Sequence, residues 1–512
     1  MTTEPATRLQ DSQGLWKSRY TLALLCMLGL AVKYAIRVNI SVAIVDMVNQ
    51  TALLESGGSG NDSDYVAGDP LACPGELAAE GVDSRKEGYF VWDKHKQGEI
   101  LAAFYYGYTV GHLPGGVLAD RFGGKLIFGI GIFLSSLLTV LTPASAWAGD
   151  HILFVNRLGV GLFQGGIVPT VQTLICSWAP DHERSRFSIV FLGMYWGIVA
   201  SMAATGALCE TAAGWPLAFY VFGGLGLLWC VPWYLLVADS PARHPRIDPA
   251  ERRYIEASIV SSARKKLPVP WRSVISTPAV WAMVAFLITF DWSFYLLITS
   301  LPLYLANIMH FDMHSNGLLS AIPHITGGVG SLLFGWLADF VFRKGYVSKI
   351  TGFRLINAIG LLGPAAALVV VALVGCDTAV IVVMLALSGF CMATNCSGFY
   401  MNMQAIAPNY AGTIVGVVNT FGNLSGIIVP YVVGAFTNAN QKRSAWNAVF
   451  YLSAALSAAG YVAYAVFTTA EEQPWNTCPS GKESKAKSDG SADTATIEDE
   501  VVEESGHKSL DF

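Results

Sequence analysis

Two arginines stand inside long apolar stretches of this sequence. Arg37 lies in the run 20–47, and Arg157 lies in the run 151–176. An arginine side chain stays cationic in a protein, and holding one near the middle of a bilayer costs about 2.5–3.5 kcal/mol on insertion scales. Such a cation is tolerated where it faces an aqueous cavity or a partner. Because the planar guanidinium matches carboxylate and phosphate groups, the pair predicts an anion site between two membrane helices.

The two arginines are expected at a similar depth in the bilayer. The first apolar run leads outward from the cytoplasm, so Arg37 lies past its middle. The fourth run begins outside, so Arg157 lies about six residues, or about 9 Å, from its start. Two fixed cations in one cavity repel each other and favour an anion between them. The alternative is that each arginine pairs with an acidic side chain or a carbonyl group of the protein.

Three further titratable side chains lie inside apolar runs. Lys33 precedes Arg37 by one helical turn on the same face, so it either adds a third cation or titrates. A carboxylate within a span, such as Asp291, is functional by default. It either pairs with Lys33 or Arg37 or serves the coupling cation. His324 either titrates or packs as a hydrogen-bonded histidine.

Neutral hydrogen-bonding side chains are expected to complete the anion site, namely Tyr105, Tyr108, Tyr295, Asn395 and Asn402. No arrangement typical of a catalytic triad, an HExxH zinc site or a carboxylate pair lies within an apolar run. The nine cysteines are scattered and form no Cys-x-x-Cys pair. We therefore expect no enzymatic activity, no metal and no cofactor.

Composition places the chain in a lipid bilayer. Its 512 residues are 53% hydrophobic and 13% charged, whereas a soluble domain carries about 25% charged residues. A spanning helix needs about 20 apolar residues, and twelve runs qualify: 20–47, 97–119, 125–145, 151–176, 187–209, 215–237, 278–305, 316–339, 350–374, 378–402, 411–436 and 445–469. We predict an all-α integral membrane protein with twelve transmembrane helices in two six-helix bundles. Since no basic run exceeds three residues, nucleic acid is not an expected partner.

Basic residues set the expected orientation, because they accumulate in cytoplasmic loops. The segment 238–277 carries eight of them, whereas the loop 48–96 has nine acidic residues against four basic ones. Both termini are therefore expected in the cytoplasm and the loop outside or in a lumen. Asn49 and Asn61 begin glycosylation sequons in that loop. A plasma membrane and a lysosomal or vesicular membrane both fit this arrangement.

The twelve runs divide into two bundles, 20–237 and 278–470, joined by a cytoplasmic linker over 238–277. The linker contains a short helix whose first turn places Glu251 at the capping-box position. Residues 1–19 form the N-terminal segment. The polar, acidic tail 471–512 has the composition of a disordered segment.

A short pattern repeats at matching places in the two halves. At the end of the second run, Gly116 and Asp120 are followed by the basic residues Arg121 and Lys125. At the end of the eighth run, Gly335 and Asp339 stand at the matching places. The glycines are expected to allow close helix approach, and the aspartates to cap a neighbouring helix and pair with the basic residues. Breaking this clamp would let one half rock against the other. The alternative is a solvated aspartate.

The run from Gly116 to Lys125 resembles the loop 2–3 signature of the major facilitator superfamily, and residues 20–470 fit its twelve-helix plan. A finer resemblance is to its anion-transporting solute carriers, which include sialin, the vesicular glutamate transporters and the type I sodium–phosphate cotransporters. The strings that carry it are Ile36-Arg37-Val38-Asn39, Leu113-Pro114-Gly115-Gly116, Trp292-Ser293-Phe294-Tyr295 and Ile406-Ala407-Pro408-Asn409. The resemblance implies that Arg37, Arg157, Tyr108 and Tyr295 line an anion site, and that the protein is a monomer.

The fourth run departs from the proton-coupled members, which carry glutamates where this chain has Val160 and Gln164. Glutamine cannot titrate, so proton coupling through that place is absent. We expect a secondary active transporter of small organic anions or inorganic phosphate, driven by sodium or by the membrane potential. Two alternatives stay open: a sialin-like, proton-coupled symporter of acidic sugars or organic anions, and a nutrient sensor that does not transport.

Overall fold

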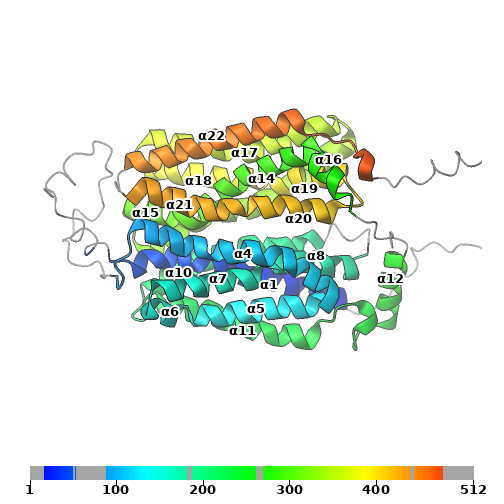
Figure 1. Ribbon diagram of the computed structural model, residues 1–512, viewed down its shortest axis with the longest axis horizontal. Coiled ribbons are helices and arrows are strands. Elements are labelled where there is room, and N and C mark those ends of the chain that lie inside the picture. Colours follow the sequence, from blue (N-terminus) through cyan, green and yellow to red (C-terminus); the bar gives the residue numbers. More distant parts are fainter. Residues whose placement is uncertain are drawn as a thin grey trace, which may run out of the picture.

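The structure, a computed structural model, describes residues 17–49, 52, 88–180, 187–260, 269–438 and 443–476. Helices make up nearly all of these residues, and the β pairing among them is one isolated bridge between Val48 and Phe90. Figure 1 shows two bundles of roughly parallel helices lying side by side, one built from each half of the chain. The predicted all-α fold is confirmed.

The N-terminal half provides six spans, several of them interrupted. They are α1 (Ser18–Met47), α4 (Lys94–Phe122), α5 with α6 (Gly124–Val140, Thr142–Ala148), α7 with α8 (Asp150–Gly165, Ile167–Trp178), η3 with α10 (Ser188–Phe191, Leu192–Cys209) and α11 (Pro216–Leu236). We call the end of the molecule where α1 finishes and α4 begins the loop end. The opposite end, where α1 begins, is the termini end. In Figure 1 the loop end lies on the left.

The C-terminal half repeats this plan. Its spans are α14 with η5 and α15 (Pro278–Tyr295, Leu296–Ser300, Leu301–Asn307), α16 (Met313–Lys344), α17 (Lys349–Val374), α18 with α19 (Thr378–Met392, Asn395–Ile406), α20 with α21 (Ala411–Gly422, Leu424–Asn438) and α22 (Arg443–Phe467). A short 3-10 turn, η6 (Pro474–Asn476), follows. In a bilayer, irregular backbone is tolerated only where protein or a cavity covers it, so these breaks are expected to face other helices.

Ten of the described helices are long and apolar enough to cross a membrane, or eleven when the bent pair of α5 and α6 counts as one span. α4 is not in that set, and its first turns carry Lys94, His95, Lys96 and Glu99. It nevertheless packs along α7 in its own half and along α21 in the other. With α4, the structure accounts for the twelve expected helices.

The linker between the halves contains η4 (Pro241–Arg243), α12 (Pro249–Val260) and α13 (Trp271–Ser276). The capping-box prediction for Glu251 is wrong. The first turn of α12 is capped by Asp248, whose Oδ1 accepts the backbone N–H of Ala250 at 3.0 Å. Glu251 is buried and instead accepts the backbone N–H groups of Ser18 (3.0 Å) and Arg19 (3.3 Å) at the start of α1. Its carboxylate therefore ties the linker to the unsatisfied N-terminus of the first membrane helix.

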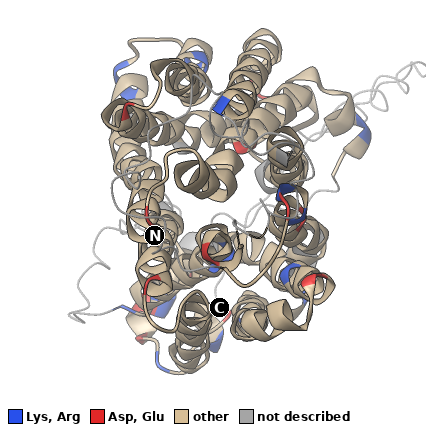
Figure 2. Cartoon of the chain, turned by 90° about the vertical axis from the view of Figure 1, so that its left-hand side faces the viewer, with Lys and Arg blue, Asp and Glu red and all other residues tan. Residues whose placement is uncertain are grey.

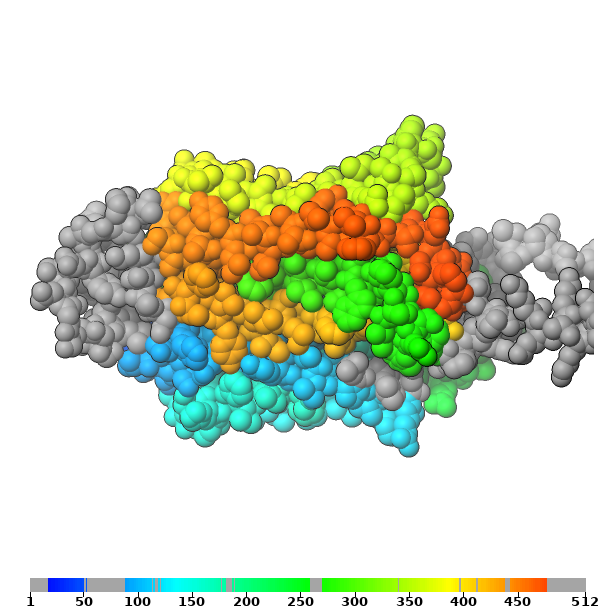
Figure 3. Space-filling view, turned by 45° about the horizontal axis from the view of Figure 1, so that its top comes forward, coloured from blue at the N-terminus to red at the C-terminus, as the bar shows by residue number. Residues whose placement is uncertain are grey.

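The two halves meet closely at the loop end. α10 crosses α16 there, where Cβ atoms added at Gly206 and Gly317 would lie 2.5 Å from the backbone oxygens of Met313 and Met202. Nearby, the Glu210 carboxylate accepts the backbone N–H of His314 from the other half at 2.9 Å. Figure 2 looks onto this end, with the helices seen end-on, and Figure 3 shows the halves in contact along one face. Direct backbone contact of this kind closes the loop end.

We predict that Glu251→Ala lowers the free energy of unfolding by about 1–3 kcal/mol, because one buried and one partly buried N–H group lose their acceptor. The measurement is the melting temperature of the purified protein in detergent. Glu256→Ala is the matched control on the same helix, since Glu256 forms an exposed ion pair with Arg252 at 2.8 Å and such pairs contribute little. Equal effects of the two substitutions would contradict the proposed link between α12 and α1.

We predict that Gly317→Val separates the halves at the loop end, because its side chain would overlap the α10 backbone. Spin labels at Ile152 and Phe436, which are exposed on α7 and α21, would report longer distances by pulsed electron resonance. Gly335→Val is the matched control on the same helix, because a Cβ at Gly335 meets nothing within 4 Å. An unchanged distance distribution for Gly317→Val would show that this contact does not hold the end closed.

Candidate functional site

Aromatic rings surround Arg37 on several sides. Its guanidinium carbon lies 4.8–5.5 Å from five ring centroids: Tyr105 (4.8 Å), Tyr295 (5.0 Å), Phe104 (5.1 Å), Tyr108 (5.2 Å) and Tyr34 (5.5 Å). Both halves contribute, because Tyr295 comes from α14 and the other rings come from α1 and α4. Ring faces attract a cation and carry no net charge. The cage therefore holds the arginine in place without neutralising it.

Arg157 shares this compartment. Its Nη2 donates to the backbone oxygen of Arg37 at 3.2 Å, and its guanidinium carbon lies 5.8 Å from the Phe104 ring. The two guanidinium groups thus lie against the same aromatic side chain. Both arginines are buried, with 4% (Arg37) and 1% (Arg157) of their surface exposed. The structure brings together the two residues on which the sequence prediction rested.

Several nitrogen atoms of the two arginines have no hydrogen-bond partner. These are Nε and Nη2 of Arg37 and Nε and Nη1 of Arg157. Within the described residues, no acidic side chain forms an ion pair with either group. A buried charge without a counter-charge is strongly unfavourable, so the site is suited to an anion that accepts these hydrogen bonds.

Lys33 belongs to the same cluster. It is fully buried, and its Nζ donates to the Tyr108 hydroxyl at 3.3 Å. The ammonium lies 4.3 Å from the centroid of the Tyr34 ring and 4.9 Å from that of the Tyr108 ring. Lys33 therefore lies beside Arg37 and forms no ion pair in the described part of the chain, and its role as a third cation stays a prediction.

Asp291 approaches the site from the other half of the molecule. It lies on α14 one turn before Tyr295, and its Oδ2 lies beside Gly422, where α20 ends. In the described part of the chain, no basic nitrogen lies within 4.0 Å of its carboxylate. The ion pair with Lys33 or Arg37 that the sequence left open is therefore not formed.

The tyrosines link the two halves at this site. The Tyr105 and Tyr295 rings lie 4.9 Å apart, centroid to centroid. The Tyr295 hydroxyl donates to Oδ1 of Asn423 at 2.9 Å, in the break between α20 and α21. Sequence reasoning had missed Asn423, Tyr34 and Phe104. Helical spacing could have found the last two, since Tyr34 precedes Arg37 by three residues and Phe104 precedes Tyr108 by four.

Three predicted site residues are not brought to the arginines. The Asn402 side chain donates to the Tyr464 hydroxyl at 2.7 Å and to Thr468 at 2.8 Å, so it joins α19 to α22 instead of facing the cage. Asn395 opens α19 at a helix break, and its Oδ1 has no hydrogen-bond partner. His324 packs edge-on against Phe294 at 6.1 Å, and its Nε2 has no hydrogen-bond partner.

The predicted clamp at the termini end is only partly described. The surroundings of Gly116 and the side chains of Asp120 and Asp339 lie outside the description. Arg121 is exposed and lies over the Phe122 ring. Around Gly335 a Cβ would meet nothing within 4 Å, so the prediction of close helix approach there is wrong.

Asp239 performs the helix capping that was expected of an aspartate in the repeated motif. Its Oδ1 accepts the backbone N–H of Lys125 at 2.8 Å, at the start of α5. The Lys125 ammonium donates to the backbone oxygen of Tyr234 at 2.8 Å. These contacts stay within the N-terminal half.

The glycosylation predictions fall at the loop end. The Asn49 side chain accepts the backbone N–H of Ala52 at 2.9 Å. Asn61 lies outside the described residues. Both sequons stay predictions.

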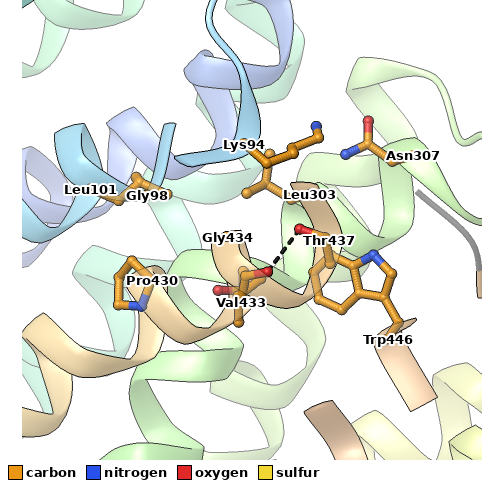
Figure 4. A pocket seen from close by; sticks show the side chains of 11 residues that line it. Lys94, Gly98, Leu101, Leu303, Asn307, Pro430, Val433, Gly434, Thr437 and Trp446 are labelled. Atoms are coloured by element: carbon orange, nitrogen blue, oxygen red, sulfur yellow. Dashed lines mark hydrogen bonds between the residues drawn. The ribbon is translucent and has the colours of Figure 1, made fainter. Parts of the chain in front are cut away.

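A separate pocket lies at the loop end (Figure 4), lined by α4, α15, α21 and α22. Lys94 and Asn307 reach toward each other across it. None of the residues of the aromatic cage lines this pocket. We therefore place the candidate anion site at the arginines and not here.

The sequence of the chain is similar to known transporters. A sequence model described as Major Facilitator Superfamily matches residues 26–430. Human sialin is 35% identical over 476 residues, which cover 92% of this chain and 93% of sialin. Human vesicular glutamate transporter 2 is 34% identical over 466 residues, covering 89% and 75%. A putative inorganic phosphate cotransporter of Drosophila melanogaster is 31% identical over 478 residues, covering 91% and 88%.

Solved structures share the fold at low sequence identity. A bacterial homologue of the human lysosomal transporter Spinster, in an inward-facing and occupied conformation, is 16% identical with a TM-score of 0.64 and covers 90% of this chain and 100% of its own. A D-xylose–proton symporter is 15% identical with a TM-score of 0.61 and covers 89% and 99%. At such identities the likeness concerns the fold alone.

Proposed function

Because the chain belongs to the Major Facilitator Superfamily, we propose that it is a secondary active transporter that binds a small anion between Arg37 and Arg157. The observation that carries this proposal is the pair of buried guanidinium groups that both lie against Phe104, whose free nitrogens have no acidic partner in the described part of the chain. An anion in this compartment would supply the missing counter-charge.

The substrate is a small organic anion or inorganic phosphate. Two of the similar proteins are named for glutamate and for inorganic phosphate, both of them anions. The aromatic rings and tyrosine hydroxyls of the cage suit an anion that also carries apolar or hydroxyl-bearing parts. These observations support an anionic solute and leave its identity to experiment.

Transport proceeds by alternating access. The glycine contact between α10 and α16 closes the loop end, and rocking of one half against the other opens it and closes the termini end. Both termini and the linker face the cytoplasm, as the basic residues of 238–277 indicate. In this orientation the structure represents a conformation that is closed at the loop end, on the side away from the cytoplasm. The cage includes rings from both halves, so this motion would also reshape the site.

Energy comes from sodium or from the membrane potential, which is worth about 2.3 kcal/mol per charge per 100 mV. Gln164 is fully buried with both side-chain polar atoms unpartnered, and it cannot carry a proton. A sialin-like, proton-coupled mechanism is the second candidate. It is favoured by Asp291, a carboxylate one turn before Tyr295 on α14 that has no basic partner in the described part of the chain.

We predict that Arg157→Ala abolishes anion uptake into proteoliposomes, because removing one partner of a buried charge interaction costs about 2–5 kcal/mol. This corresponds to at least about 30-fold weaker binding. The assay screens phosphate, sialate, glutamate and urate under imposed sodium, proton and voltage gradients. Arg157→Lys should keep part of the uptake, and the exposed Arg252→Ala should keep all of it. Normal uptake by a folded Arg157→Ala protein would eliminate this mechanism.

We predict that Asp291→Asn removes the response of uptake to one ion gradient while anion exchange without a gradient persists, because asparagine keeps the shape but loses the charge. Loss of the response to sodium supports sodium coupling, and loss of the response to pH supports the proton-coupled alternative. His324→Gln tests the other candidate proton carrier in the same assay. A gradient response that survives Asp291→Asn would exclude Asp291 from coupling.

A further inference from the structure

We propose that Lys33 makes this site select anions that carry two negative charges. The inference rests on the proposed anion transport and adds a rule for its substrate. A doubly charged anion here means a tetrahedral dianion such as sulfate or hydrogen phosphate, or a short dicarboxylate.

Three cations form one continuous cluster. Lys33 and Arg37 both lie against the rings of Tyr34 and Tyr108, at 4.3 and 4.9 Å for the ammonium and 5.5 and 5.2 Å for the guanidinium. Arg37 and Arg157 both lie against Phe104, at 5.1 and 5.8 Å. Neighbouring basic groups in the cluster therefore contact the same uncharged aromatic side chains.

The other titratable groups near the cluster supply little negative charge. Among the described residues of α1, α4, α7 and α14, Asp291 is the acidic residue that interacts electrostatically with Arg37 and the surrounding tyrosines. On α4, His112 lies 5.7 Å from Tyr108, ring to ring, and its Nδ1 has no partner. On α16, His324 packs against Phe294. On α7, Gln164 and Val160 are neutral.

The charges do not balance without a ligand. Three cations and one carboxylate give 3 − 1 = 2 net positive charges when all four groups are ionised. A bound monoanion would leave one positive charge uncompensated, whereas a dianion would leave none. The difference in binding free energy between a dianion and a monoanion grows when the halves close around the ligand, because charge interactions strengthen as water leaves the site.

The geometry also suits such a ligand. The free nitrogens of Arg37 and Arg157 offer planar, directional donors to one anionic group. The Lys33 ammonium is a compact charge with three donors, one of them directed to the Tyr108 hydroxyl at 3.3 Å. Its position one turn from Arg37 places the third charge toward the termini end of the cluster. A second anionic oxygen or a second carboxylate would meet it there.

The test compares anions of similar shape and different charge. Sulfate and methanesulfonate carry two and one negative charges throughout the working pH range, and succinate and butyrate form a four-carbon pair at pH 7.5. Binding to the purified protein is followed by thermal stabilisation, and transport by competition with the best anion of the uptake screen. Because sulfate is the more strongly hydrated ion, the quantity that reports on Lys33 is the change in the sulfate-to-methanesulfonate affinity ratio between wild type and variant.

We expect Lys33→Gln to lower this ratio at least about tenfold, or about 1.4 kcal/mol, while methanesulfonate binds as well as before or better. Lys33→Arg should keep the ratio. Lys94→Gln is the matched control, because Lys94 is a second buried lysine, 6% exposed, at the loop-end pocket outside the cage. In the wild type, succinate should compete at least about tenfold better than butyrate, a measurement that needs no variant.

The outcomes separate this inference from the proposed function. An unchanged affinity ratio in Lys33→Gln, or butyrate competing as well as succinate in the wild type, overturns the role of Lys33 while anion transport stands. If no anion of either charge stabilises the wild type, the anion site itself is wrong and this inference falls with it.

Discussion

The rest of the structure depends on one electrostatic constraint, which is that basic side chains are buried among the helices without an ion-pair partner in the described part of the chain. Lys33, Arg37 and Arg157 are all less than 5% exposed, and no described acidic residue forms an ion pair with any of them. Their neighbours include aromatic faces, the hydroxyls of Tyr105 and Tyr108 and the backbone carbonyl of Arg37. These groups stabilise a cation without cancelling its charge, which is the basis of the proposal that an anion binds here.

This constraint explains why the site lies where the two halves meet. The first and fourth spans bring the arginines, and the seventh span brings Tyr295 and Asp291 from the other half. The ring of Tyr295 contacts the Arg37 guanidinium, and its hydroxyl donates a hydrogen bond to Asn423 in the break between α20 and α21. A rocking motion that separates the halves would therefore remove part of the cage from the cations. In the proposed mechanism, binding and motion would be coupled through the same few side chains.

Much of the candidate site could be predicted from the sequence, because the signal for each residue lies within its own apolar run. Arg37 and Arg157 are visible because charge is rare in apolar runs, and Tyr105, Tyr108 and Tyr295 follow from their position in such runs. Asn402 could not be judged in this way. It is as polar and as deep in its run as a binding residue, but packing commits its amide to Tyr464 and Thr468.

The sequence by itself determined the class of protein, the number of membrane helices and the residues that put charge inside the bilayer. These follow from composition and helical period, which act along one segment at a time. Only the tertiary structure decided that the two arginines lie against one ring, that Asp291 pairs with no described basic residue, and that Glu251 caps α1 instead of its own helix. The physical reason is that a side chain's partner across helices depends on which faces pack together, and helical period fixes the faces of each helix but not their neighbours.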